Sequence, residues 1–318
     1  WTGAVRVDNG YITQGEVVAL INYMSQILVE LVKLANLIIN INKSIACGNR
    51  IQSIFEMQPS ITDGSGQKVD KVQTDTADRS EEAEYAVEFS HVGLTYAGAG
   101  DESLTDIDFK VKKGETIGII GGTGSGKSSV VNLIPRFYDV TSGFIKVDGK
   151  DVKDYPLEEL RGKIGTVLQK AVLFHGTIRE NLKWGNPDAT EEDLNRAITV
   201  AQAKEFVDNK EGGLDFEIEQ GGKNLSGGQR QRLTIARAVV KKPEILILDD
   251  SASALDFATD AALRKAIREM EGETTVFIVS QRAASIQHAD RIVVLDDGKI
   301  VGLGTSEELL ESCEDRKS

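Results

Sequence analysis

The sequence is poor in the residue types that build disulfide frameworks, metal centres and nucleic-acid surfaces. Its 318 residues include two cysteines and three histidines, and the formal net charge is −13 at pH 7. Cys47 and Cys313 lie far apart in no CxxC or Cys/His spacing, so neither disulfides nor a zinc site is indicated. His91, His175 and His288 have no acidic or thiol partner at catalytic spacing, and we interpret them as structural. Because phosphates attract a basic surface, the acidic balance argues against a nucleic-acid partner.

A secretory signal peptide is also lacking. The chain begins at Trp1 without a basic start, an apolar middle and a small-residue cleavage site. We interpret it as a piece that starts inside a longer protein. Hydrophobic residues make up 40% of the sequence and charged residues 27%, which is typical of a globular protein. The length allows two ordinary domains.

One long apolar run lies near the N-terminus, at Val17–Ile41. As a helix of about 25 residues it would extend roughly 37 Å, enough to span a bilayer. Six polar side chains interrupt it, and at roughly 100° per residue they fall within one sector of about 120°. These are Asn22, Gln26, Glu30, Lys33, Asn36 and Asn40. The run therefore predicts a helix with one apolar face and one polar stripe.

Two kinds of helix carry such a stripe. One is a long amphipathic helix of a soluble or surface-bound protein. The other is a transmembrane helix whose polar side faces a water-filled pathway. Lys43 and Arg50 follow the run, which suits a cytoplasmic end under the positive-inside rule. The run alone leaves both interpretations open.

The rest of the chain divides by composition. Residues 58–84 are polar, acidic and almost free of large apolar side chains, so they are predicted to be a linker. Beyond them, short apolar runs alternate with helical stretches, which predicts a largely parallel sheet covered by helices. The runs are Thr116–Ile120, Ile164–Leu168, Ile245–Leu248, Thr275–Val279 and Ile292–Leu295.

The strongest motif follows the first of these runs, where Gly121–Ser128 fits GxxxxGK[ST]. Its glycines let successive backbone N–H groups point inward and form an anion nest. Lys127 would reach the β- and γ-phosphates of ATP, and the Ser128 hydroxyl would bind Mg²⁺. Asp249 ends another apolar run, where a P-loop fold places a carboxylate beside the phosphate loop to hold the metal. The predicted phosphate-binding residues are Gly121, Gly122, Thr123, Gly124, Ser125, Gly126, Lys127, Ser128 and Ser129.

A second glycine-rich motif is formed by Leu225, Ser226, Gly227, Gly228 and Gln229. Ser226 suits a helix N-cap, and the glycines leave backbone donors exposed at the helix N-terminus, so this is a second anion-binding surface. With this motif the sequence resembles the ABC transporter family, whose signature is LSGGQ. The resemblance implies that the signature of one chain covers ATP held by the phosphate loop of another, so that two chains form two composite sites.

The family's order of motifs implies roles for further residues. Tyr96 corresponds to the aromatic residue that stacks on adenine, and Gln169 to the glutamine that touches the metal and the attacking water. Ser253–Asp256 corresponds to the loop that crosses the dimer interface. Leu173–Asn181 resembles the exporter branch in particular, which favours a membrane-spanning helix for the apolar run.

Two positions depart from the family pattern. Asp250 stands where members that hydrolyse ATP well carry a glutamate as general base, and its carboxylate is one methylene shorter. Gln281 stands where the family carries a histidine that contacts the γ-phosphate, and it cannot become cationic. Both positions belong to the nucleotide that this chain itself would hold. We therefore expect its own ATP site to be degenerate, as in one subunit of heterodimeric multidrug exporters.

The resemblance implies an α/β fold and three regions. Residues 1–57 hold the last transmembrane helix and its extension, 58–84 the linker, and 85–318 a P-loop NTPase (ABC ATPase) domain with a helical subdomain. We expect an exporter of small, amphipathic or drug-like molecules in a bacterial cell membrane, multi-pass as a whole, with its ATPase domain cytoplasmic. Its expected partners are a second half-transporter, the lipid bilayer and the transported molecule. A homodimer with two active sites and a non-transport ABC ATPase acting on nucleic acid or ribosomes are the alternatives.

Overall fold

The structure is a computed structural model of the chain. It describes residues 1–57, 59–64, 84–251, 254–270 and 272–312. Within these residues the chain forms two compact units, Trp1–Thr62 and Asp63–Ser318. Most of the predicted linker lies outside the described residues, as do Ser253 of the predicted interface loop and Cys313.

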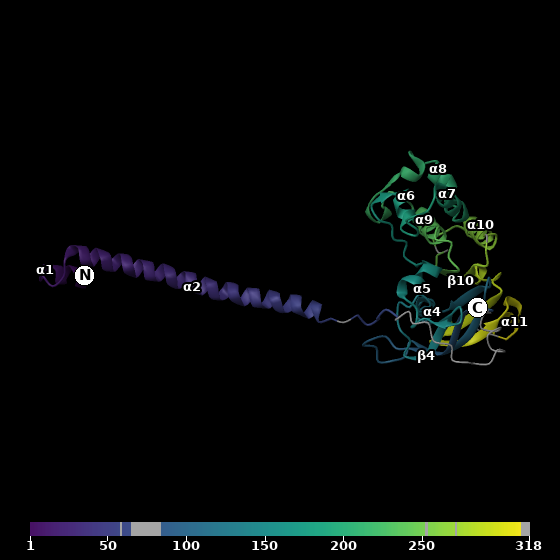
Figure 1. Ribbon diagram of the computed structural model, residues 1–318, viewed down its shortest axis with the longest axis horizontal. Coiled ribbons are helices and arrows are strands. Elements are labelled where there is room, and N and C mark those ends of the chain that lie inside the picture. The colour runs from purple at the N-terminus through teal and green to yellow at the C-terminus, as the bar shows by residue number, and fades with distance from the viewer. Residues whose placement is uncertain (58, 65–83, 252–253, 271, 313–318) are drawn as a thin grey trace. The chain divides into compact units, whose positions relative to one another are not determined.

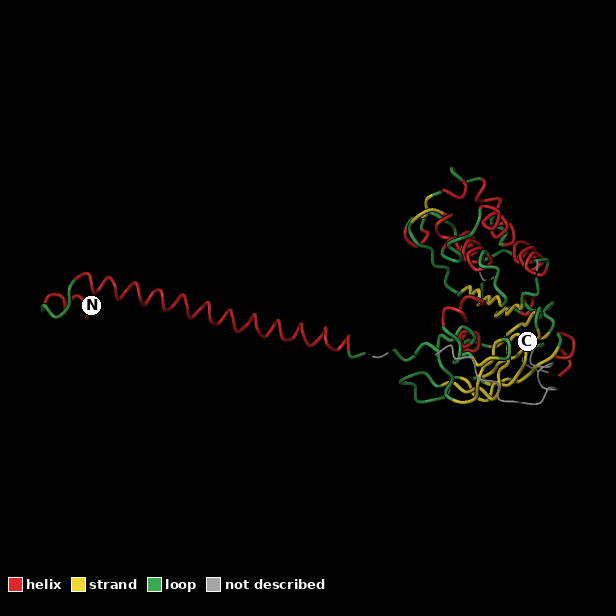
Figure 2. Tube along the Cα trace, viewed as in Figure 1, coloured by secondary structure: helices red, strands yellow, loops and turns green. Residues whose placement is uncertain are grey.

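The first unit consists of two helices, α1 (Thr2–Asp8) and α2 (Gln14–Phe55) (Figure 1). A capping box starts α2, because the Thr13 hydroxyl accepts from the backbone N–H of Glu16 while the Glu16 carboxylate accepts from the backbone N–H of Thr13. The helix has 42 residues, which corresponds to about 63 Å. It therefore extends beyond the predicted apolar run at both ends. Figure 2 shows it as one continuous helix.

Length and composition allow α2 to cross a membrane, as they do for no other helix in the described part of the chain. None of its residues is buried within its unit. In the polar stripe, the Lys33 ammonium lies 2.8 Å from the Glu30 carboxylate. This contact pairs the two charges of the stripe on neighbouring turns.

The second unit is built around a six-stranded sheet. In spatial order its strands are β12 (Lys299–Gly304), β11 (Arg291–Asp296), β3 (Thr116–Gly121), β10 (Thr275–Val279), β9 (Ile245–Asp249) and β6 (Ile164–Val167). Only β12 is antiparallel to its neighbour. All five apolar runs named from the sequence are strands here, and the prediction of a largely parallel sheet is confirmed.

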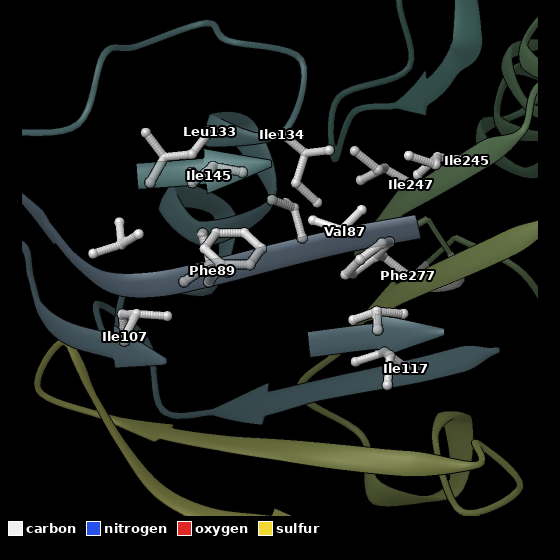
Figure 3. Packing of buried hydrophobic residues seen from close by; sticks show 14 of the residues in the cluster. Val87, Phe89, Ile107, Ile117, Leu133, Ile134, Ile145, Ile245, Ile247 and Phe277 are labelled. Carbon is white, nitrogen blue, oxygen red and sulfur yellow. The ribbon is translucent and has the colours of Figure 1, made fainter. Parts of the chain in front are cut away.

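A four-stranded antiparallel sheet packs on the same core. Its strands are β2 (Leu104–Lys112), β1 (Tyr85–Leu94), β4 (Ser142–Val147) and β5 (Lys150–Asp151). Val87 and Phe89 of β1 share one buried cluster with Phe277 of β10 (Figure 3). The Phe89 and Phe109 rings stack with centroids 4.6 Å apart. The cluster between the two sheets fixes the strand ends from which the site loops emerge.

Helices cover the sheets and also form a separate group. The helices are α4 (Lys127–Leu133), α5 (Leu157–Lys163), α6 (Ile178–Lys183), α7 (Glu191–Val200), α8 (Lys204–Asp208), α9 (Gly227–Val239), α10 (Phe257–Arg268) and α11 (Ser306–Ser312). Figure 1 shows α6, α7, α8 and α9 gathered together. Short elements connect this group: β7 (Gly176–Thr177), β8 (Glu217–Ile218) and the 3-10 turns η1 (Gly213–Asp215) and η2 (Gln220–Gly222). A third 3-10 turn, η3 (Ala283–Ser285), follows β10. The grouped helices form the predicted helical subdomain, packed on a second buried cluster that includes residues of β6 and β9.

Candidate nucleotide-binding site

The phosphate loop runs from the end of β3, which lies between β11 and β10, into α4. Gly124 and Gly126 have φ angles of 87° and 93°, which L side chains rarely adopt. At Gly121 a Cβ atom would lie 2.2 Å from the Leu295 carbonyl oxygen of β11. The motif therefore needs Gly124 and Gly126 for their positive φ angles, and Gly121 because the backbone of a neighbouring strand lies too close for a side chain.

Lys127 occupies the centre of this loop and is 8% exposed. Its ammonium donates to the carbonyl oxygens of Gly121 at 2.8 Å and Gly122 at 2.5 Å. Burial lowers the pKa of Lys127, while the carboxylates of Asp249 and Asp250 act in the opposite direction. The loop thus holds a buried positive charge close to backbone donors, which is an environment for an anion.

Ser128 and Asp249 bring two oxygen ligands together. The Ser128 hydroxyl donates to Asp249 Oδ1 over 3.0 Å. Burial raises the pKa of Asp249 and the Asp250 carboxylate adds to the rise, whereas the Ser128 hydrogen bond and Lys127 lower it. No cluster of three or more His, Cys, Asp or Glu residues suited to a metal occurs among the described residues. Two protein oxygens completed by phosphates and waters is the arrangement that Mg²⁺ prefers, so these residues fit that ion.

A cavity of about 640 Å³ joins these groups. The residues predicted from the sequence that line it are Tyr96, Thr123, Gly124, Gly126, Lys127, Ser128, Ser129, Gln169, Asp249, Asp250 and Gln281. They come from the end of β1, the phosphate loop, the segment after β6 and the ends of β9 and β10. These strand ends bring residues from distant parts of the sequence to one place, as parallel sheets do at their carboxyl edges.

The side of the cavity after β9 and β10 carries the two departures from the family pattern. The Gln169 amide donates to Asp250 Oδ2 over 3.2 Å. Asp250 has a left-handed backbone, with φ of 46°, and its N–H donates to the Val279 carbonyl over 3.0 Å. Gln281 is exposed at the cavity wall. Two amide side chains, those of Gln169 and Gln281, and the carboxylate of Asp250 therefore lie together on this side of the cavity.

The LSGGQ motif lies elsewhere in the unit, at the start of α9. Ser226 caps the helix by accepting from the backbone N–H of Gln229 over 3.2 Å, while Gln229 Oε1 accepts from the backbone N–H of Ser226 over 3.0 Å. None of its five residues lines the cavity. The helix N-terminus predicted from Ser226 is confirmed, and the role toward another chain's ATP stays a prediction.

Two cavity segments had not been predicted from the sequence. Residues 99–103 and the turn Asp297–Gly298 also line the cavity. Gly298 donates its N–H to the Ser125 carbonyl over 3.3 Å and accepts from the N–H of Thr105 over 2.9 Å. An Asp-Gly pair with positive φ at both residues, 42° and 74°, is a recognisable hairpin signal. Nothing local in the sequence places that hairpin against the phosphate loop.

The fold and the cavity together define a P-loop ATPase domain. Residues 104–253 match the family model that is described as ABC transporter. This domain belongs to the ABC transporter family. The expected ABC ATPase domain behind a long apolar helix is thereby confirmed, and the expectation that this helix is transmembrane stays a prediction.

Relatives of known sequence support this assignment over nearly the whole chain. An uncharacterized ABC transporter ATP-binding protein of Mycobacterium bovis is 39% identical over 316 residues, which are 98% of this chain and 52% of the relative. A putative multidrug export ATP-binding/permease protein of Bacillus subtilis is 38% identical over 305 residues, or 96% of this chain and 51% of the relative. The chain thus spans about half the length of the curated relatives it matches.

A solved structure of a bacterial Atm1-family ABC exporter with ATP bound is also similar. The TM-score is 0.78 at 29% sequence identity, and the match covers 96% of this chain and 52% of the other. Because the match covers 96% of this chain, it includes residues of α2 as well as the ATPase domain.

Proposed function

We propose that this chain is the C-terminal part of an ABC exporter half-transporter and that its ATPase domain binds MgATP in the cavity described above. The observation that carries the proposal is the convergence of Lys127, Ser128 and Asp249 with Tyr96 in one cavity. The names of the multidrug-export relatives and the fold of the solved exporter support the transport role. The acidic charge balance argues against a nucleic-acid substrate.

Within this proposal each side chain has one task. Lys127 leaves its two loop carbonyls and donates to the β- and γ-phosphates. Ser128 and Asp249 hold Mg²⁺, which neutralises phosphate charge when bound. Tyr96 stacks on adenine, and Gln169 orients the attacking water beside the metal.

The signature belongs to a second site in this proposal. Leu225–Gln229 lies outside the chain's own cavity, and its helix N-terminus offers backbone donors to an anion. A partner half-transporter would supply the nucleotide that this surface covers. The helix α2 would span a bacterial cell membrane as the last transmembrane helix, next to a pathway for a small, drug-like molecule, with the ATPase domain on the cytoplasmic side.

The chain's own site is degenerate in this proposal, so the partner is a different half-transporter. Asp250 carries the shorter carboxylate where a general base would act, which weakens proton abstraction because the base must lie within hydrogen-bond reach of the water. Gln281 adds no positive charge at the γ-phosphate position. The site then retains ATP, and hydrolysis takes place mainly in the partner's site.

Restoring the two family residues tests this function. The purified chain should bind MgATP with slow turnover. In the assembled transporter, Asp250→Glu with Gln281→His should raise turnover at least about tenfold, since a positioned base contributes that much or more. Phosphate release is measured, with the same double substitution on a Lys127→Ala background as the control. If the wild-type chain alone hydrolyses ATP as fast as the restored variant, the site is not degenerate and a homodimer with two active sites becomes the better interpretation.

A further inference from the structure

Tyr96 contacts the side chains of Ser129 and Tyr138, and the proposed function gives these two contacts no role. Its phenol O–H donates to the Ser129 hydroxyl over 2.8 Å. Its ring meets Tyr138 in an edge-to-face pair, with centroids 4.9 Å apart and an interplanar angle of 86°. Tyr96 and Ser129 line the cavity, whereas Tyr138 does not. The Tyr138 ring therefore supports Tyr96 away from the space that a ligand would enter.

The backbone on both sides of Tyr138 is itself fixed. The Arg136 guanidinium is 5% exposed and lies 2.7 Å from the Asp139 carboxylate, three residues further along the chain. The N–H of Phe137 donates over 3.0 Å to the carbonyl of Asn132, a residue of α4. This bond ties the segment to the end of that helix. Tyr138 is 44% exposed, so little of its area serves the core. An anchored segment with a half-exposed ring is suited to orienting a neighbour rather than to filling space.

The second support links the ring to the phosphate loop. A hydroxyl can accept one hydrogen bond while donating its own proton to another acceptor. Ser129 can therefore accept from Tyr96 and donate to a phosphate oxygen at the same time. The Ser129 hydroxyl thus keeps its own donor for phosphate whether or not Tyr96 donates to it.

We propose that Tyr138 and Ser129 are positioning residues for the nucleotide base, which together hold the Tyr96 ring in the orientation that stacks on it. The inference rests on the proposed nucleotide function and deepens it. A preset ring lowers the entropy lost when the base binds. Affinity for the base part of the ligand then depends on Tyr138, although Tyr138 does not reach the ligand.

The test compares two ligands that share phosphates but not a base, MgATP and magnesium tripolyphosphate. Binding to the 318-residue chain and its variants is measured by calorimetry. Tyr138→Leu should raise the Kd for MgATP about three- to tenfold, the range of an aromatic pair, and leave the tripolyphosphate Kd within about twofold. Tyr138→Phe keeps the ring edge and should leave both constants within about twofold. Phe137→Leu removes the neighbouring exposed aromatic ring and is the matched control.

The hydroxyl contact has its own variant. Tyr96→Phe keeps the ring and loses the bond to Ser129, so the Kd for MgATP should rise about two- to fivefold with tripolyphosphate unchanged. An unchanged MgATP affinity in this variant overturns the role given to Ser129. Tyr138→Leu weakening both ligands by the same factor, or weakening neither, overturns the role given to Tyr138. Wild-type chain that binds neither ligand overturns the proposed function as well, whereas tight binding of both by wild type with no separation in the variants overturns this inference alone.

Discussion

The phosphate loop and the LSGGQ motif are both glycine-rich segments that lead into a helix, yet the structure equips them differently. The phosphate loop surrounds a buried ammonium, that of Lys127, and lies beside a hydroxyl and a carboxylate in one cavity. The LSGGQ motif has its helix capped by its own Ser226 and Gln229 side chains and has no residue in that cavity. The phosphate loop has the parts of a complete anion site, whereas the LSGGQ motif offers only the backbone donors of a helix N-terminus.

The first glycine of each motif also differs in how closely its backbone is packed. Gly121 lies against the Leu295 carbonyl of the neighbouring strand. At Gly227, by contrast, an added Cβ would meet no atom within 4 Å. At Gly228, the next residue of the signature, a Cβ would lie 3.1 Å from the Ala254 carbonyl oxygen, so the contrast belongs to the first glycine of each motif. The proposal gives the two motifs different nucleotides because only the phosphate loop lines the chain's own cavity.

The largest expected effect comes from removing the buried cation. Lys127→Ala should weaken MgATP binding roughly 100-fold, because two charge-assisted hydrogen bonds to phosphate are lost. Lys170→Ala removes the same charge from an exposed position outside the cavity and should leave binding unchanged. Calorimetric titration of both variants measures the contrast. Equal losses in the two variants would contradict a specific role for Lys127.

The second-largest expected effect is a difference in stability between alanine substitutions at Gly121 and Gly227. Gly121→Ala forces a Cβ against a backbone oxygen and should lower the free energy of unfolding by about 2 to 3 kcal/mol. Gly227→Ala enters open space at the start of α9 and should change it by less than about 0.5 kcal/mol. Thermal unfolding of the two variants compares them directly. Similar melting temperatures would show that the phosphate loop is as adaptable as the signature.

The smallest effect concerns pH. Because burial raises the pKa of Asp249, the folded state keeps its proton at a pH where an exposed aspartate has lost it. Mg²⁺ binds the carboxylate, so Mg²⁺-dependent ATP affinity should fall as the pH is lowered, beginning above the ordinary aspartate pKa of about 4. In the absence of ligand the sign is opposite, and the unfolding free energy gains from protonation of this group.

Asp249→Asn separates this titration from that of the nucleotide itself. The variant should bind Mg²⁺ weakly at every pH and retain only the dependence that belongs to ATP. An identical pH profile in wild type and variant would exclude Asp249 as the titrating metal ligand.

Sequence patterns predicted the parts of the fold whose signal is local. The central strands were recognisable because they are buried on both faces and read as continuous apolar runs. The antiparallel sheet was not predicted, although β2 alternates buried and exposed residues with the period of a half-buried strand. The predicted helix at 17–41 was too short, since apolar composition marked its limits while the helix begins after a capping box at Thr13 and continues to Phe55.

The site divides in the same way. The phosphate loop was predictable because its function requires consecutive residues at fixed spacing. The contact of Gly298 with Ser125 joins residues far apart in the sequence, and the Tyr96–Tyr138 pair depends on how β1 and the segment after α4 pack. Such contacts form only when the sheets have assembled, and no local sequence motif predicts them.

The two loop carbonyls that hold Lys127 also bear on what a phosphate would have to displace. A buried ammonium without partners would be costly, and the loop would have to open or lose the proton whenever its ligand departs. Here the carbonyl oxygens of Gly121 and Gly122 accept from this ammonium. A phosphate bound by Lys127 would therefore replace acceptors that the loop itself supplies, so the net gain from each new hydrogen bond is smaller than its full strength.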